Sequence, residues 1–206
     1  MTLQLFKWMM ALAIMLYLPM LFERVRGIRR QEGKRSDAYV KERVERIYFD
    51  VTHFYNRLGT LRQEEEGGGA SIPFPVKADK DEWPDFDRLY CTDAWTAQVG
   101  AVQQGDERYS SVSDVENEGF FTRNYWTAFA DLDFLYANKV EVIDRSGDVA
   151  TVSLTLHNGD RSVPVLLVMN FEHDDWRIDN MTYYWNEKPS TRYYDWRQEM
   201  EKYNYR

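Results

Sequence analysis

The first strong pattern in the chain is an apolar stripe of helical period that begins after Ser36. Its members step by three or four positions, which places them on one face of a helix. They are Val40, Val44, Ile47, Val51, Phe54 and Leu58. Ser36 or Asp37 can cap the start of this helix, and Gly59 is expected to end it. The pattern predicts a helix of roughly 20 residues that buries one stripe.

Residues 60–84 interrupt the pattern. They contain a glycine triplet at 67–69 and three prolines, Pro73, Pro75 and Pro84. Spaced prolines and consecutive glycines sustain neither a helix nor a strand. We therefore expect a flexible excursion over 60–84.

A second helical stretch follows this excursion. Its apolar positions are Phe86, Leu89, Tyr90, Trp95 and Val99. We expect a break near Thr92, after which Asp93 can cap a new start. Residues 103–119 are polar and are interpreted as a loop.

Beyond residue 139 the apolar period changes from helical to two, which is the period of a strand. Four such runs follow one another, at 140–142, 150–156, 163–171 and 176–178. The second and third are separated by Asn158-Gly159, the strongest short signal for a hairpin. Four strands joined by tight turns predict an antiparallel meander. The third run is apolar on both faces, so we expect it to be the most buried strand.

The tail, residues 190–206, has apolar positions three or four apart at Tyr193, Trp196, Met200 and Tyr203. This spacing predicts a short C-terminal helix. Helices that precede an antiparallel meander indicate an α+β domain.

Composition narrows the functional classes. The chain has 206 residues, 44% of them hydrophobic and 16% aromatic, which suits one packed domain with appendages. Its formal charge of -8 is the balance of +1 in 1–22, +4 in 23–46 and -13 in 47–206. An acidic body lacks the basic footprint that nucleic-acid binding needs. A single cysteine, Cys91, excludes an intrachain disulfide and a cysteine-based metal cluster.

Residues 1–35 combine an apolar leader with a basic collar. Trp8 to Phe22 carries no charge, a length that suits a signal peptide, and a count from Leu3 reaches that of a membrane anchor. We expect a periplasmic protein or one anchored in the inner membrane through residues 3–22. The collar follows the apolar run, so the positive-inside rule leaves a cytoplasm-facing anchor as an alternative.

The segments Asp131-Leu132-Asp133-Phe134 and Trp176-Arg177-Ile178-Asp179-Asn180 resemble the nuclear transport factor 2-like superfamily, and in particular its exported bacterial members of unknown function. The resemblance covers about residues 37–203. It implies a cone-shaped, curved antiparallel sheet packed against a long N-terminal helix. The domain would then span 36–189, with the tail as an added helix. The same fold carries both enzymes and binding modules, so it assigns no activity by itself.

Catalytic candidates are few. Asp131 and Asp133 lie on one side of an extended segment, where Asp131 with a tyrosine could act as a general base at a cavity mouth. His53 could point into the cavity from the first helix. Of the three histidines, His157 and His173 fall at turns. The chain shows no spacing typical of a metal site, and no motif for a phosphate or dinucleotide cofactor.

Aromatic residues offer a second type of site. Candidates to line a pocket for a small apolar or sugar-like ligand are Tyr55, Tyr125, Trp126, Phe129 and Tyr184. The main hypothesis is a non-enzymatic binding or scaffold domain that can form a homodimer or bind a protein partner. Two alternatives remain open: a small-molecule lyase or isomerase that uses Asp131 or His53, and a component of a membrane assembly.

Overall fold

The computed structural model describes residues 24, 32–66, 84–112, 124–129, 132–187 and 190–203. The chain divides into two compact units, Met1–Tyr39 and Val40–Arg206. Nearly all of the leader and collar lies outside the described residues. Within the described part of the chain, no helix is long and apolar enough to cross a membrane.

In the first unit, Ser36 caps the start of helix α2 (Asp37–Glu66). The Ser36 hydroxyl accepts the amide of Tyr39 at 3.3 Å and donates to the Gly33 carbonyl at 2.8 Å. A serine in this position satisfies a backbone amide that the helix itself leaves unpaired. The predicted capping by Ser36 is confirmed.

In the second unit, α2 buries the predicted stripe. Val40, Val44, Ile47 and Val51 are fully buried, and Tyr48 and Tyr55 widen the stripe. The prediction that Gly59 ends the helix is wrong, because α2 continues to Glu66. One interior glycine costs a helix only about 1 kcal/mol, and the residues after it are good helix formers. Residues 67–83, the rest of the predicted excursion, lie outside the described residues.

The predicted second helical stretch is confirmed as two helices, α3 (Phe86–Tyr90) and α4 (Asp93–Val112). Asp85 caps α3 by accepting the amide of Arg88 at 3.0 Å. Thr92 caps α4 by accepting the amide of Trp95 at 3.1 Å. The predicted loop is wrong over 103–112, where helix formers such as glutamine, glutamate and arginine extend α4 although the sequence is polar. Residues 113–119 lie outside the described part of the chain.

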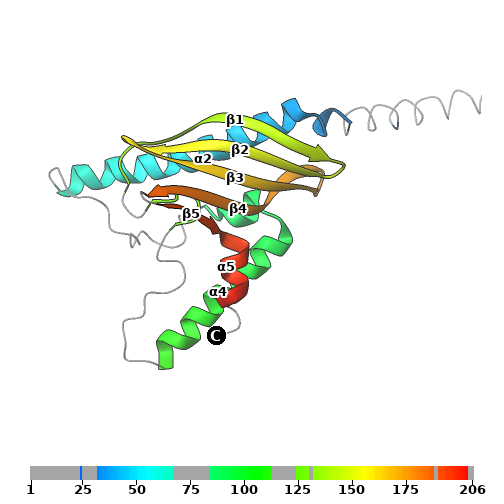
Figure 1. The fold of residues 1–206 in the computed structure, drawn as a ribbon. Coiled ribbons are helices and arrows are strands. Elements are labelled where there is room, and N and C mark those ends of the chain that lie inside the picture. Colours follow the sequence, from blue (N-terminus) through cyan, green and yellow to red (C-terminus); the bar gives the residue numbers. More distant parts are fainter. Residues whose placement is uncertain are drawn as a thin grey trace, which may run out of the picture. The chain divides into compact units, whose positions relative to one another are not determined.

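The strands form one antiparallel sheet in the order β1-β2-β3-β4-β5 (Figure 1). They are β1 (Leu135–Ser146), β2 (Val149–Asn158), β3 (Arg161–Glu172), β4 (Asp175–Glu187) and β5 (Ser190–Asp195). The predicted meander and the α+β class are confirmed. The sheet is tied to α2 by Asn56, whose side chain donates to the Leu135 carbonyl at 2.7 Å and accepts its amide at 2.8 Å.

Strand β3 occupies the centre of the sheet. Val163, Val165, Leu167 and Met169 are buried on its inner face. The alternate residues Leu166 and Val168 are half-buried on the outer face. The third predicted strand is therefore the central one, as its apolar pattern on both faces indicates.

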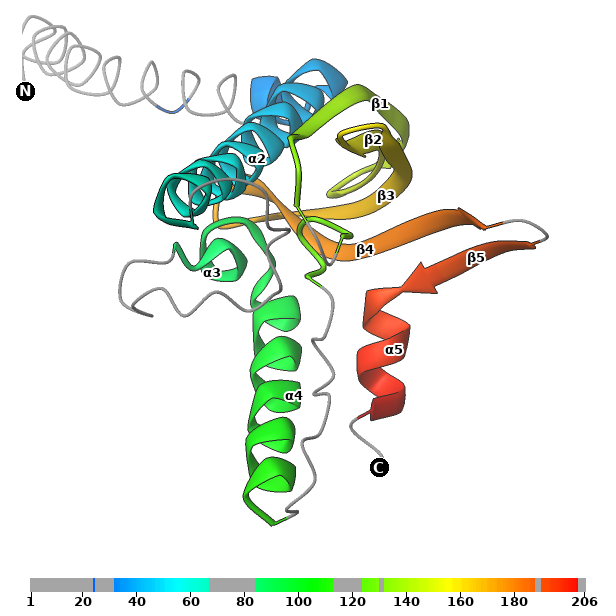
Figure 2. The ribbon, with the colours of Figure 1, turned by 90° about the vertical axis from the view of Figure 1, so that its left-hand side faces the viewer.

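The prediction of one helix over 190–206 is wrong in its first part. Ser190–Asp195 forms β5, which pairs with β4, and helix α5 spans only Trp196–Tyr203 (Figure 2). Thr191, Tyr193 and Tyr194 are β-branched or aromatic, and such residues favour a strand when a partner strand is available. Pairing with β4 thus outweighs the helical pattern, which consists of only four apolar residues.

Candidate functional site

The carboxylate of Asp87, on α3, lies at the centre of a group of neutral donors. Its Oδ1 accepts the indole Nε1 of Trp95 at 3.3 Å and that of Trp126 at 3.2 Å. The Cys91 thiol lies 3.7 Å from the same oxygen. Its Oδ2 accepts the Tyr125 hydroxyl. Among the described residues, no ion pair involves Asp87, so neutral donors alone satisfy this carboxylate.

Helical spacing explains why these groups meet. Asp87 and Cys91 lie one helical turn apart at the end of α3, and the extended backbone at Cys91 leads into α4, whose first turn carries Trp95. The break itself is fixed to the sheet, because the Thr92 amide donates to the Ile178 carbonyl at 2.9 Å. Cys91 forms a parallel bridge with Ile178. A strand of the sheet therefore holds the group in place.

Burial changes the acid–base properties of this group. Desolvation is the main cause that raises the pKa of Asp87, and the nearby charge of Asp85 adds to the rise. The hydrogen bonds from Tyr125, Trp95 and Trp126 oppose it. Burial, followed by the charge of Asp87, also raises the pKa of Cys91 and of Tyr125 well above their usual values. The Cys91 thiol and the Tyr125 phenol therefore stay protonated at neutral pH.

Three further tyrosines extend the group into the interior. Burial raises the pKa of Tyr55 to about 12, and the side-chain amide of Asn124 donates to its hydroxyl. Tyr183 donates to the carbonyl of Tyr125. We call the set formed by Tyr48, Tyr55, Asp87, Cys91, Tyr125 and Tyr183 the interior polar cluster.

Tyr48 differs from the other tyrosines of the interior polar cluster. Its side chain is fully buried, and its hydroxyl has no hydrogen-bond partner among the described residues. Burial is the main cause that raises its pKa. The Tyr183 hydroxyl lies near enough to oppose that rise in part, and it donates its proton to the Tyr125 carbonyl. Its oxygen could still accept, but its geometry toward Tyr48 is not that of a hydrogen bond.

The structure brings together part of the predicted pocket. Tyr55, Tyr125 and Trp126 are buried and take part in the contacts just described. Phe129 is also buried, but its ring lies under the guanidinium of Arg161, 5.1 Å from the ring centre. Tyr184 is half-buried and packs against the exposed ring of Tyr193.

The structure describes only one of the two predicted catalytic residues. Asp131 lies outside the described residues. His53 is exposed on α2 and stacks on Phe49, which is itself 66% exposed. The prediction that His53 points into a cavity is wrong, because the helical turn that buries Val51 and Tyr55 directs His53 to solvent.

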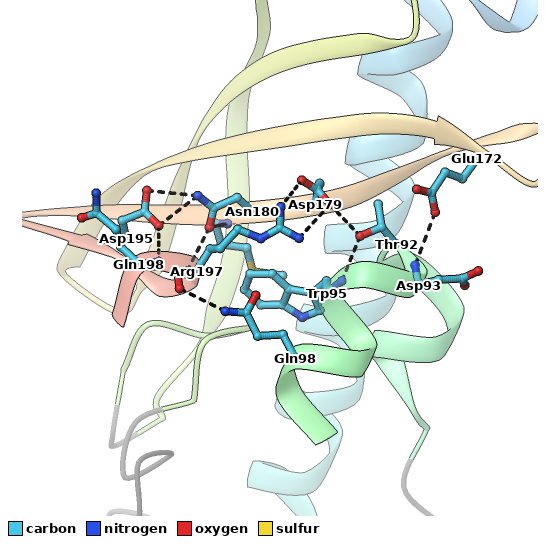
Figure 3. A network of polar contacts seen from close by, with 11 residues as sticks. Thr92, Asp93, Trp95, Gln98, Glu172, Asp179, Asn180, Asp195, Arg197 and Gln198 are labelled. Carbon is cyan, nitrogen blue, oxygen red and sulfur yellow. Dashed lines mark hydrogen bonds and ion pairs between the residues drawn. The ribbon is translucent and has the colours of Figure 1, made fainter. Parts of the chain in front are cut away.

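A separate polar network connects α4, β4 and the C-terminal tail (Figure 3). Asp179, on β4, accepts two hydrogen bonds from Arg197 of α5, at 2.6 and 3.1 Å, and one from Thr92 at 2.7 Å. Asn180 donates to both carboxylate oxygens of Asp195 at 3.0 Å. These contacts join α4, β4 and the tail, and we assign them to the framework that supports the site.

One exposed group carries metal-binding side chains. Asp93, Glu172 and His173 place one donor atom each within 4.8 Å of the others. His173 lies at a turn, as predicted, and its Nε2 is 3.0 Å from the Asp93 carboxylate. His157 instead lies in β2, half-buried and stacked on Tyr136. The hydrogen bond from His173 to Asp93 accounts for the exposed group without a metal.

The sequence patterns missed Asp87, Cys91 and Tyr48 as site residues. The available signal was a carboxylate at position 87 in helical register with Cys91 and Trp95, since an acidic residue on an apolar stripe must find buried donors. Comparison of the chain with protein-family models, with curated proteins and with solved structures finds no match. The site is therefore argued from its geometry alone.

Proposed function

We propose that this protein is a non-catalytic domain that binds a small ligand at the interior polar cluster. Support comes from the concentration of hydrogen-bonding groups among aromatic side chains, the composition typical of pockets for small apolar or sugar-like molecules. We further propose that the sheet and α2 form a nuclear transport factor 2-like cone. The antiparallel meander is compatible with that fold.

The hydroxyl of Tyr48, which has no hydrogen-bond partner among the described residues, is the observation that carries this proposal. A buried hydroxyl without a partner costs about 1–3 kcal/mol. The other polar groups of the cluster are hydrogen bonded to protein atoms, so the cost is confined to one position. A ligand with a hydroxyl or carbonyl oxygen would remove that cost, which favours binding at this position.

Substitution of Tyr48 by phenylalanine tests the proposal. Removing an unsatisfied hydroxyl is expected to leave the free protein as stable as before, or about 1 kcal/mol more stable. The same substitution should weaken the binding of every ligand that a thermal-shift screen of small hydroxylated compounds identifies. Tyr136→Phe, at an exposed tyrosine, is the matched control. A Tyr48→Phe variant that is clearly destabilised would show that the hydroxyl is already bonded, and the proposal would fail.

Catalysis is the second candidate, and the hydrogen bond from Tyr125 to Asp87 favours it. An aspartate with a raised pKa beside a tyrosine donor suits a general base in a lyase or isomerase. The Asp87 carboxylate also accepts the indole N–H of Trp126, so two neutral donors could orient such a base. Incubation of each bound compound with the protein, followed by mass spectrometry, decides between binding and turnover. An unchanged compound supports binding, and a product absent from the Asp87→Asn reaction supports catalysis.

We also propose that residues 3–22 tether the domain to a membrane, at the periplasmic side or, in the alternative, facing the cytoplasm. The apolar run motivates this proposal, since its affinity depends on buried area and persists in salt. The collar adds about 1 kcal/mol for each basic residue near anionic headgroups, and this share fades in salt. The full chain should stay in the membrane fraction through a high-salt wash. Release by salt alone would contradict the tether.

A further inference from the structure

We propose that the interior polar cluster selects a positively charged ligand, a small organic cation such as a quaternary or substituted ammonium group. This inference rests on the proposed binding function and adds the chemical class of the ligand. It follows from the charge of Asp87, from the aromatic rings around it and from the charge of the whole body.

Within the described part of the chain, hydrogen bonds satisfy the charge of Asp87, but no ion pair balances it. Its contacts come from two indoles, a phenol and a thiol, all of them neutral. Burial raises the pKa of Asp87, and the charge of another carboxylate, that of Asp85, adds to the rise. Asp87 keeps partial exposure. A cation that reached this side chain would therefore meet an uncompensated negative charge in surroundings that strengthen electrostatic attraction.

Hydrogen-bond capacity is also left on one oxygen of Asp87. The Oδ1 atom accepts two indole N–H groups and faces the thiol, whereas Oδ2 accepts the single hydroxyl of Tyr125. A carboxylate oxygen has two lone pairs. With the contacts that the described residues make, Oδ2 can therefore accept a further donor, the N–H of a substituted ammonium group or the hydroxyl of choline, without loss of an existing bond.

Aromatic rings surround the Asp87 carboxylate. Phe86 packs against Trp126 at 5.7 Å between ring centres and stacks on Tyr90 at 6.0 Å. Tyr125 contacts Trp126 at 6.1 Å and Trp95 at 5.7 Å. Trp95, Tyr125 and Trp126 turn N–H or O–H edges toward Asp87, whereas ring faces are what attract cations. The faces of this aromatic cluster could hold the methyl groups of a quaternary ammonium ion next to the carboxylate.

One of these rings, that of Tyr90, already contacts a positively charged side chain of the protein. The guanidinium carbon of Arg43 lies 5.3 Å from the centre of the Tyr90 ring. Asp175 balances that charge, at 3.1 Å from Arg43 Nε, so the guanidinium does not neutralise Asp87. The body, residues 47–206, carries a formal charge of -13 and attracts cations over a longer range. Carboxylate and phosphate ligands would be repelled by the same charges.

The experiment compares choline with its neutral isostere 3,3-dimethyl-1-butanol by isothermal titration calorimetry on the full chain. The two molecules differ in charge but hardly in shape. We expect choline to bind at least about tenfold more tightly than the neutral alcohol. Asp87→Asn should remove this preference. Asp144→Asn makes the same charge change at an exposed position on β1 and should retain the preference.

A pH series on the unmodified chain covers the case in which Asp87→Asn does not fold. Choline affinity should fall as pH is lowered and Asp87 takes up a proton, while the affinity of the neutral alcohol stays constant. Among the described residues, the titratable groups that interact with Asp87 are Asp85, which caps α3, and Tyr55, Cys91 and Tyr125, and the last three stay neutral across this range. The guanidinium of Arg177, from β4, acts on Cys91.

The outcomes separate the two proposals. Equal binding of choline and the alcohol would overturn the cation preference but leave the binding function standing. Binding of neither probe would also overturn it, and the Tyr48→Phe stability then decides the binding function by itself. A preference for choline that persists in Asp87→Asn would place the cation elsewhere and overturn this assignment.

Discussion

Arg197 and Asp179 join the C-terminal helix to the sheet through two hydrogen bonds between one guanidinium and one carboxylate. The Nη1 to Oδ2 distance is 2.6 Å and the Nη2 to Oδ1 distance is 3.1 Å. The two residues are 18 positions apart, on α5 and β4. Asp179 also accepts the hydroxyl of Thr92, the cap of α4. One carboxylate thus connects three elements beside the candidate site (Figure 3).

Replacing Arg197 by alanine should therefore destabilise the fold. The Asp179 side chain is only 12% exposed, so loss of its partner leaves a nearly buried charge with one hydroxyl. We expect a loss of about 2–3 kcal/mol by urea denaturation, below the full cost of a buried pair because the Arg197 side chain is 28% exposed. Lys202→Ala, which breaks an exposed pair with Glu199 on the same helix, should cost no more than about 0.5 kcal/mol. Equal losses in the two variants would refute the role assigned to Asp179.

Gly159 has both a backbone and a steric requirement for glycine. Its φ of 57° lies in the left-handed region, and an added Cβ would collide with the Asp133 carboxylate. Gly147 has a φ of 61° but open space around it. Gly147→Ala should lower the free energy of unfolding by about 1 kcal/mol through the backbone alone, and Gly159→Ala should lower it by about 1 kcal/mol more.

Thermal denaturation of both glycine variants measures this difference. Combining Gly159→Ala with Asp133→Ala removes the colliding group, so the added cost of Gly159→Ala should disappear in that background. If the cost of Gly159→Ala is the same with and without Asp133, the contact is not its cause.

Asp87 should make stability depend on pH in a defined direction. Its pKa in the folded chain lies above the ordinary value of 3.8, so the folded state binds this proton more tightly than the unfolded state does. The stabilisation is complete below pH 3.8 and is lost as pH rises through the raised pKa. Asp87→Asn cannot ionise, so its stability relative to the unmodified chain should increase over that window. Urea denaturation of both proteins at a series of pH values checks this, and a constant difference would contradict it.

The sequence predicted those elements whose apolar pattern matches their burial. The stripe from Val40 to Val51 and the alternation of β2 and β3 fall into this class, because each repeats one period over several residues. Prediction from the sequence failed where pairing with a segment distant in the chain determines the structure. Ser190–Asp195 becomes a strand because β4 is adjacent, and no local spacing records that pairing.

The same distinction applies to the candidate site. Tyr55, Tyr125 and Trp126 could be proposed because large aromatic residues are recognisable in any sequence. The spacing of Asp87 from Cys91 and Trp95 hinted at a buried carboxylate but not at its role, which depends on indole and phenol donors from α4 and the turn at 124–129. The tertiary structure alone brings these donors to one carboxylate.

Cys91 should be unreactive in the native protein. Its side chain is 1% exposed, and burial raises the pKa of its thiol well above the usual value of 9.0, so the reactive thiolate is scarce. Labelling by a thiol reagent at pH 8 should therefore occur only through unfolding, with a rate that rises in parallel with the unfolded fraction in urea. Cys91 is the only cysteine of the chain, so one reaction reports on the site directly. Rapid labelling without urea would mean that the cluster around Asp87 opens by itself.

Leu167→Asp should be among the most destabilising substitutions in the chain. Leu167 is fully buried on the inner face of the central strand β3, and it pairs with Val152 on β2 and Met181 on β4. An aspartate there would have a charge without a partner, which we expect to cost about 3 kcal/mol or more. Leu166→Asp is the matched control, because the adjacent side chain is half-buried on the outer face beside Ser153 and Thr182. Its aspartate can reach water, so we expect a loss of about 1 kcal/mol. The free energies of unfolding of the two variants should differ by about 2 kcal/mol, and equal values would show that the two faces of β3 are equally buried.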